Sequence, residues 1–206
     1  MHTHPFRRHR WLPRSIPLLA LVACAPLAAH AAATPPASVV PVAASPAPVA
    51  ALEVSRYTGT WLQLAAIPQP FSLACALDTR AEYGTAPGGL TVRNSCTTRF
   101  GTRDERVGFA RVTDPSTNAQ LAVTFRAEAD PATNYVVTAL DPEYRWALVV
   151  NPGRTAGFVL SREPVLEADQ WAAVRAGIST AGMDACLFLT SPITGGRDGI
   201  EPLCAR

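Results

Sequence analysis

The sequence lacks lysine, and its histidines are confined to its start. All 18 basic side chains among the 206 residues are arginines. The histidines are His2, His4, His9 and His30. The chain after residue 30 therefore lacks the groups required for a histidine-dependent catalytic triad, a histidine metal site or a lysine Schiff base. These absences exclude three common kinds of active site.

Positive charge is also scarce once the N-terminal segment is set aside. Four arginines fall within the first 14 residues, which leaves 14 arginines against 16 acidic side chains and a net charge near −2. A nucleic-acid-binding domain usually presents a basic patch or stripe. We therefore expect no nucleic-acid partner.

The N-terminal segment is typical of an export signal. A basic region ending at Arg14 precedes the apolar stretch 16–23, which is too short to span a bilayer as a helix. Leu21-Val22-Ala23-Cys24 fits a bacterial lipobox, in which Cys24 is acylated and becomes the new N-terminus. We predict a signal peptide with lipobox over 1–24, lipidation of Cys24, and an outer-membrane lipoprotein that faces the periplasm.

Two other export routes remain open. Ala29-His30-Ala31 fits an ordinary signal-peptidase site, with small residues at the positions that this enzyme reads. Cleavage there would give a soluble periplasmic or secreted protein. Arg7-Arg8 offers a weaker twin-arginine signal.

Four cysteines remain after Cys24, namely Cys75, Cys96, Cys186 and Cys204. An even number in an exported chain indicates two disulfides, with three possible connectivities. No pair has the C-x-x-C spacing of a zinc site, so we expect no metal.

The composition divides the chain into a tether and a domain. Residues 25–52 are almost entirely alanine, proline, valine and serine, which predicts a disordered, semi-extended tether. Residues 53–206 form the predicted domain. Turn signals recur there every 10 to 15 residues, from Pro68 to Asn151-Pro152-Gly153.

This rhythm indicates an antiparallel β-meander. We expect strands at 59–67, 75–84, 89–98, 104–113, 119–127, 133–141, 145–151 and 156–162. A helix follows from 167, and a short strand lies near 186–190. The predicted fold is all-β: an eight-stranded antiparallel up-and-down β-barrel with one C-terminal α-helix, wide enough for one small ligand.

Alternation along the strands predicts a dry interior. Over 75–84, one face would carry Leu77, Thr79, Ala81 and Tyr83, and the other Asp78, Arg80 and Glu82. A barrel in the outer membrane needs the reverse pattern, with its apolar band toward lipid.

The alternation also places Cys75 close to opposite Cys96 across a hairpin that turns near Pro87. This favours a Cys75–Cys96 disulfide and leaves Cys186 and Cys204 to form the second.

Three segments carry a resemblance to a known family. They are Arg56-Tyr57-x-Gly59-Thr60-Trp61, Tyr135 to Val149 with Asp141-x-Glu-Tyr144, and Leu160-Ser161-Arg162. In order and spacing they resemble the three lipocalin signatures, in the style of bacterial outer-membrane lipoproteins. The resemblance implies that Trp61 closes the narrow end of the barrel and that Arg162 stacks over it. It also implies structural roles for Gly59, Asp141 and Tyr144. Another connectivity known among lipocalins joins Cys75 to a C-terminal cysteine.

The resemblance implies a binding protein without cofactor, not an enzyme. We expect it to bind, store or transport small hydrophobic ligands, such as fatty acids and lysophospholipids, and to reach the membrane through its lipid anchor. The candidate lumen residues are Leu77, Tyr83, Leu90, Val92, Val123, Phe125, Tyr135, Val137, Phe158 and Leu160. Two alternatives stay open: a lipocalin-fold enzyme acting on a lipid or carotenoid, and a protein-interaction module with a filled barrel.

Overall fold

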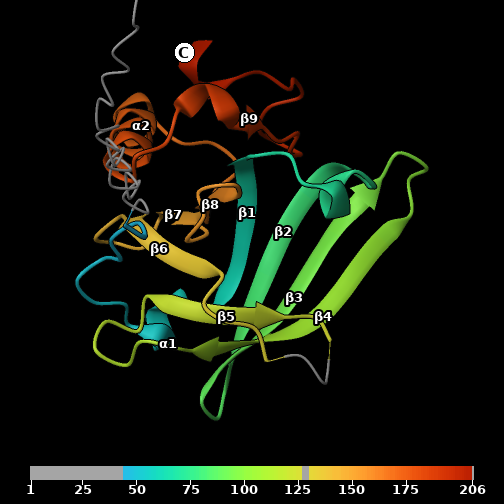
Figure 1. Cartoon of the computed structure of the whole chain (residues 1–206). Coiled ribbons are helices and arrows are strands. Elements are labelled where there is room, and N and C mark those ends of the chain that lie inside the picture. The colour runs from blue at the N-terminus through green and yellow to red at the C-terminus, as the bar shows by residue number, and fades with distance from the viewer. Residues whose placement is uncertain (1–43, 127–129, 206) are drawn as a thin grey trace, which may run out of the picture. The chain divides into compact units, whose positions relative to one another are not determined.

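The structure is a computed structural model that describes residues 44–126 and 130–205 (Figure 1). The predicted signal peptide, Cys24 and residues 25–43 of the predicted tether lie outside these ranges. Among the described residues, none of the helices combines the length and apolarity needed to span a bilayer.

Eight antiparallel strands form a closed barrel, as the turn rhythm predicted. Each pairs with the next along the chain, and the pairing of the eighth with the first closes the ring, with Leu62 opposite Ser161. The strands are β1 (Gly59–Ala66), β2 (Cys75–Ala86), β3 (Gly89–Thr98), β4 (Arg103–Val112), β5 (Gln120–Thr124), β6 (Tyr135–Leu140), β7 (Trp146–Val150) and β8 (Gly157–Ser161).

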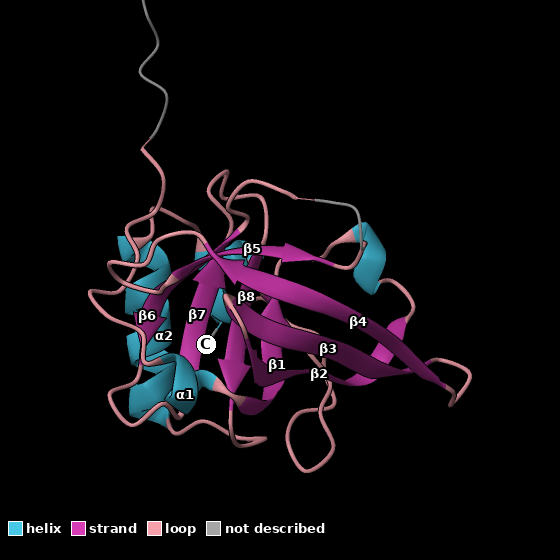
Figure 2. Ribbon diagram, turned by 90° about the horizontal axis from the view of Figure 1, so that it is seen from below, coloured by secondary structure: helices cyan, strands magenta, loops and turns pink. Residues whose placement is uncertain are grey.

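Helical segments lie at the two ends and on one side of the barrel. The short helix α1 (Val54–Tyr57) precedes β1, and the 3-10 turn η1 (Pro70–Ser72) follows it. Helix α2 (Ala168–Thr180) packs on the outer face of β6 and β7, to one side of the barrel in Figure 2. The chain ends with η2 (Ala185–Leu187), β9 (Leu189–Thr190) and η3 (Leu203–Ala205).

Alternation along the strands builds two separate cores. Inward side chains of all eight strands form a lumen cluster, which includes Trp61, Tyr83, Leu90, Leu121 and Leu160. Outward side chains form a second core beneath α2 and the C-terminal segment, where Trp146 and Leu148 meet Val174, Ile178 and Phe188. The lumen cluster is the part that bears on function.

The regular alternation predicted for β2 is wrong near the beginning of the strand. Its pairing with β3 skips a residue twice, between Cys75 and Leu77 and between Leu77 and Arg80. Asp78 lies between these points with φ of 55°. One inserted residue reverses which face the following side chains occupy. Leu77 therefore pairs with Thr97, on the face opposite to Tyr83.

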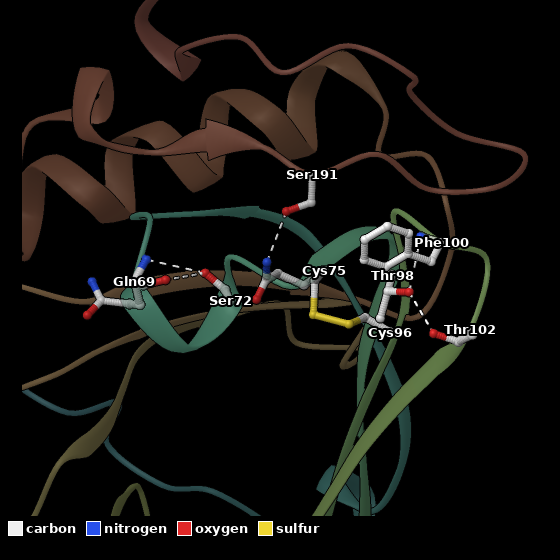
Figure 3. The surroundings of a disulfide bond; sticks show 9 residues. Gln69, Ser72, Cys75, Cys96, Thr98, Phe100, Thr102 and Ser191 are labelled. Carbon is white, nitrogen blue, oxygen red and sulfur yellow. Dashed lines mark hydrogen bonds between the residues drawn. A yellow bond between two sulfur atoms is a disulfide. The ribbon is translucent and has the colours of Figure 1, made fainter.

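Both disulfides, Cys75–Cys96 and Cys186–Cys204, are present in the structure. The register differs from the expectation, because the Cα partner of Cys75 is Thr98. The bond to Cys96 instead runs diagonally across β2 and β3, with 5.5 Å between the Cα atoms. Figure 3 shows it beside the β3–β4 turn that carries Phe100.

The tether prediction needs a correction at its C-terminal end. Residues 44–52 pack on the barrel, although their composition is that of the preceding segment. The Val49 amide donates to the Val137 carbonyl at 2.8 Å, and the Leu52 amide to the Thr117 carbonyl at 2.7 Å. Leu52 is buried in the lumen cluster. These contacts satisfy backbone groups that a free tether would leave to water.

Candidate functional site

The end of the barrel next to α1 is closed by a stacked Trp–Arg pair. The Arg162 guanidinium carbon lies 3.8 Å from the centre of the Trp61 ring. The indole Nε1 donates to the Tyr57 carbonyl at 2.8 Å. The guanidinium also donates at 2.7–2.8 Å to three carbonyls, those of Arg56, Thr58 and Thr60. Arg162 thereby holds α1 against the start of β1.

Gly59 makes this close approach possible. Its φ is +89°, a value that side-chain-bearing residues rarely adopt. A Cβ atom there would also lie 3.3 Å from the Arg162 guanidinium. Gly59 and Trp61 therefore belong to one structural unit, in which both residues contact the Arg162 guanidinium.

The β6–β7 turn braces the same end. The Asp141 carboxylate accepts from the side chain of Arg145 at 2.7 and 2.9 Å and from the amides of Glu143 and Arg145 at 3.0 and 3.1 Å. These bonds, the Arg145 side chain first, lower the pKa of Asp141. The Tyr144 hydroxyl accepts from the Glu53 amide at 2.8 Å. The turn thus fixes the chain just before α1.

Exposure rises along the lumen face from the closed end toward the other end. On β3 the inward residues Leu90 and Val92 are buried and Asn94 is exposed, and only Cys96 beyond it is buried again, in its disulfide. On β4 the inward sequence from Ala110 to Arg106 also runs from buried to exposed. The half next to α1 is therefore filled with side chains, and solvent reaches the lumen face of the other half. We call this open half the cup.

Eight of the ten candidate lumen residues belong to the lumen cluster. Six are buried in it: Tyr83, Leu90, Val92, Tyr135, Val137 and Leu160. Val123 and Phe158 are half-buried against it. Phe125 lies beyond the cluster, with its ring against Gly108 and 41% exposed. Leu77 is also outside the cluster, and it alone of the ten faces outward, because the bulge turns it to the outer face.

The candidate lumen residues predicted from the sequence did not include the polar side chains of the cup. Asn94 and Arg106 are Cα partners on β3 and β4, on the same face as Val92. Gln63 faces inward on β1 and donates to the Ser191 hydroxyl at 3.0 Å. Counting every second residue from Leu90 along β3, and its partners on β4, could have identified Asn94 and Arg106. Arg106 gives the cup a cationic group close to its mouth.

Three tyrosine hydroxyls meet where the filled half ends. Tyr57, Tyr83 and Tyr135 are at least nine-tenths buried. The Tyr135 hydroxyl lies 2.6 Å from that of Tyr57 and 3.0 Å from that of Tyr83. Burial raises the pKa of Tyr83 to about 12 and raises the pKa of Tyr57 and Tyr135. The three phenols therefore remain neutral across the ordinary pH range.

The mouth of the cup carries exposed apolar side chains. Phe71 and Leu73, in and just after η1, are 59% and 77% exposed, and Phe100 in the β3–β4 turn is 77% exposed.

A separate groove of about 460 Å³ lies outside the barrel, lined in part by Trp171, Arg175 and Arg197. In the described ranges, no three Cys, Asp, Glu or His side chains are grouped to hold a metal ion.

Comparison with known proteins decides the family. The model of the lipocalin-like domain matches residues 52–192. The chain belongs to the lipocalin family. The match spans all eight barrel strands and most of the chain that follows them.

The relatives of this lipocalin include bacterial and plant proteins. The outer membrane lipoprotein Blc of Escherichia coli K12 is 31% identical over 138 residues, covering 66% of this chain and 77% of the relative. Temperature-induced lipocalin-1 of Arabidopsis thaliana is 34% identical over 129 residues, covering 60% and 69%.

Solved structures agree with the fold. Insecticyanin from the tobacco hornworm superposes with a TM-score of 0.56 at 21% identity, over 70% of this chain and 82% of that one. Lobster apocrustacyanin A1 gives 0.54 at 16% identity, over 74% and 92%. At these identities the likeness supports the fold alone.

Proposed function

We propose that this lipocalin binds single-chain amphiphiles, fatty acids or lysophospholipids, with the acyl chain in the cup. The observation that carries the proposal is the rise in exposure along the lumen face of β5, from buried Leu121 to half-buried Val123 and exposed Phe125. Burying about 12 methylenes contributes roughly 10 kcal/mol. Association costs of about 4–15 kcal/mol offset much of this, so the expected affinity is micromolar.

Arg106 suits the head group of such a ligand. Its guanidinium has no ion-pair partner among the described residues, and the neighbouring lumen-facing residue Asn94 adds amide donors. A carboxylate or phosphate at the mouth would gain charge-assisted hydrogen bonds from both side chains. The exposed Phe71, Leu73 and Phe100 support entry of the ligand from a lipid surface.

Binding is proposed in preference to catalysis because the lumen cluster consists of apolar and aromatic side chains. We also propose that the protein is anchored in the outer membrane through Cys24 and faces the periplasm. The two disulfides, which require an oxidising compartment, and the similarity to an outer membrane lipoprotein support this location.

Native mass spectrometry of delipidated protein, titrated with palmitic acid and a palmitoyl lysophospholipid, tests the proposal. We expect one bound molecule at micromolar concentrations. Asn94→Trp places a large ring in the cup and should abolish binding. Val107→Trp is the matched control, because Val107 lies on the adjacent strand, faces outward and is 62% exposed. Absence of binding to either amphiphile below about 100 μM would refute the proposed function.

A further inference from the structure

The three buried tyrosine hydroxyls carry an inference that rests on the proposed function. Tyr83 on β2 and Tyr135 on β6 come from strands four positions apart in the ring of eight, and hence from opposite walls. Tyr57 reaches them from α1 at the closed end. Their hydroxyls therefore converge across the barrel, within 2.6 and 3.0 Å of the central one.

The three tyrosine hydroxyls have one more proton than they have hydrogen bonds. Each phenol carries one donor proton, and only two hydrogen bonds join the three hydroxyls. Each bond uses one proton, whichever way it points. One proton therefore has no acceptor among the described residues. A buried donor without an acceptor is costly, so its retention favours a partner that the chain itself does not supply.

The position of the hydroxyls places this donor at the base of the cup. Tyr83 is the Cα partner of Val92, and the next lumen-facing pair toward the mouth is Ala81 and Asn94. Val92 is buried and Asn94 is exposed, so the boundary between filled and open halves falls within this step. Tyr57 approaches from the opposite side, with its ring 5.0 Å from that of Trp61.

We propose that the hydroxyls of Tyr57, Tyr83 and Tyr135 form a binding site for an oxygen atom at the buried end of the ligand. The ligand class is an acyl chain that carries a carbonyl or hydroxyl group near its far end, held by a hydrogen bond from the free phenolic proton. A neutral acceptor is favoured over a second carboxylate. A buried anion needs a compensating cation, and Arg162 is already committed to Trp61 and three carbonyls.

Paired ligands test this site. The probes are palmitic acid and its analogue with a ketone at the penultimate carbon, which share chain length and head group. If the buried end of the cup offered only apolar groups, the ketone would bind more weakly than palmitic acid, because its carbonyl would be buried without a hydrogen-bond donor. The wild-type protein should bind the ketone at least as tightly as palmitic acid.

The variant that removes every donor is the triple substitution Tyr57→Phe, Tyr83→Phe, Tyr135→Phe. In it, the affinity for the ketone relative to palmitic acid should fall by about tenfold, the effect of one hydrogen bond. Single substitutions are less informative, because removal of Tyr57 or Tyr83 leaves two hydroxyls joined by one bond. Tyr144→Phe is the matched control: Tyr144 is buried in the same cluster, but its hydroxyl accepts from the Glu53 amide. It should leave the ratio unchanged.

A second readout uses the wild-type protein alone. The infrared carbonyl stretch of the bound, isotope-labelled ketone should lie below its frequency in hydrocarbon solvent, because a phenol donates to it. This measurement holds even if the triple variant fails to fold.

The two proposals fail in different ways. Tight binding of palmitic acid, together with weaker binding of the ketone and an unshifted carbonyl stretch, would overturn the oxygen site and leave the proposed function standing. The three hydroxyls would then be a structural bridge across the barrel or hold a buried water. No binding of either acid would refute the proposed function, and the oxygen site with it.

Discussion

At the scale of single residues, Arg162 is the side chain on which the closed end most depends. It covers Trp61 at 3.8 Å and ties three carbonyls of the segment 56–60. A cation–π contact contributes about 0.5–2 kcal/mol, the more the less it is exposed to solvent, and hydrogen bonds from a charged donor add to it. Lysine cannot reproduce this, because a planar guanidinium stacks and donates in several directions at once.

We therefore predict that Arg162→Ala lowers the free energy of unfolding by about 3 kcal/mol, and that Arg162→Lys recovers less than half of this loss. Urea denaturation followed by circular dichroism measures both. Arg93→Ala is the control, since Arg93 is exposed and its ion-pair contact with Glu105 is long, at 3.9 Å. Equal stability of Arg162→Ala and Arg93→Ala would show that the stacked pair does not hold the fold.

The tyrosines give a second residue-scale prediction, which concerns alkaline pH. The pKa of Tyr83 is raised to about 12 by burial, against about 10 for an exposed phenol. The folded state therefore keeps its phenolic protons to higher pH than the unfolded state does. The stability that this contributes is fully present below pH 10 and is lost as the pH rises from about 10 toward 12.

Unfolding and phenolate absorbance should accordingly rise together in that interval. The sequence helps, because lysine is absent and three of the four tyrosines belong to this hydroxyl cluster. A pH titration that records both signals is the measurement. The triple phenylalanine variant should lose less stability over the same range. Phenolate formation near pH 10 in a protein that stays folded would contradict the burial of these hydroxyls.

At the scale of elements, the bulge in β2 holds the C-terminal segment. The Asp78 amide donates to the Pro192 carbonyl at 3.1 Å, and its carboxylate accepts from the amide and hydroxyl of Thr194 at 2.8 and 2.9 Å. Its positive φ costs roughly 1 kcal/mol in a residue with a side chain. The contacts with the C-terminal segment offset this strain.

Asp78→Ala should lower the free energy of unfolding by about 2 kcal/mol, through loss of two accepted hydrogen bonds. Asp78→Gly should lose only about 1 kcal/mol, because glycine relieves the backbone strain. Both variants should speed amide exchange of Thr194. If exchange there stays slow in both, the C-terminal segment is held by other contacts.

Sequence prediction succeeded for strands with regular pairing and failed where the pairing is irregular. Period-two alternation located the strands and the lumen positions of β3 and β5, because the pairings of both strands with β4 are unbroken. It misplaced Leu77, because a bulge depends on tertiary contacts such as that between Asp78 and Thr194. The hydroxyl cluster was not foreseen, since strands far apart in the sequence meet there through the geometry of barrel closure. Composition could not separate 44–52 from the segment before it.

At the scale of the whole molecule, the account joins a binding cup to a membrane anchor. The anchor is proposed from the lipobox, and Cys24 lies outside the described residues. We predict that the mature N-terminus is a diacylglyceryl-modified Cys24, as shown by mass spectrometry of the purified protein. Cys24→Ala should move the protein out of the membrane fraction. An unmodified N-terminus at Ala32 would indicate soluble export instead.

The central claim is that a ligand chain lies inside the barrel, above the hydroxyls of Tyr83 and Tyr135. A crystal structure with palmitic acid brominated at its terminal carbon tests it directly, because anomalous scattering locates the bromine. We predict a bromine peak within the ring of eight strands, between Val123 and Phe158. A peak in the outer groove beside Trp171, or none in protein saturated with the acid, would contradict the account.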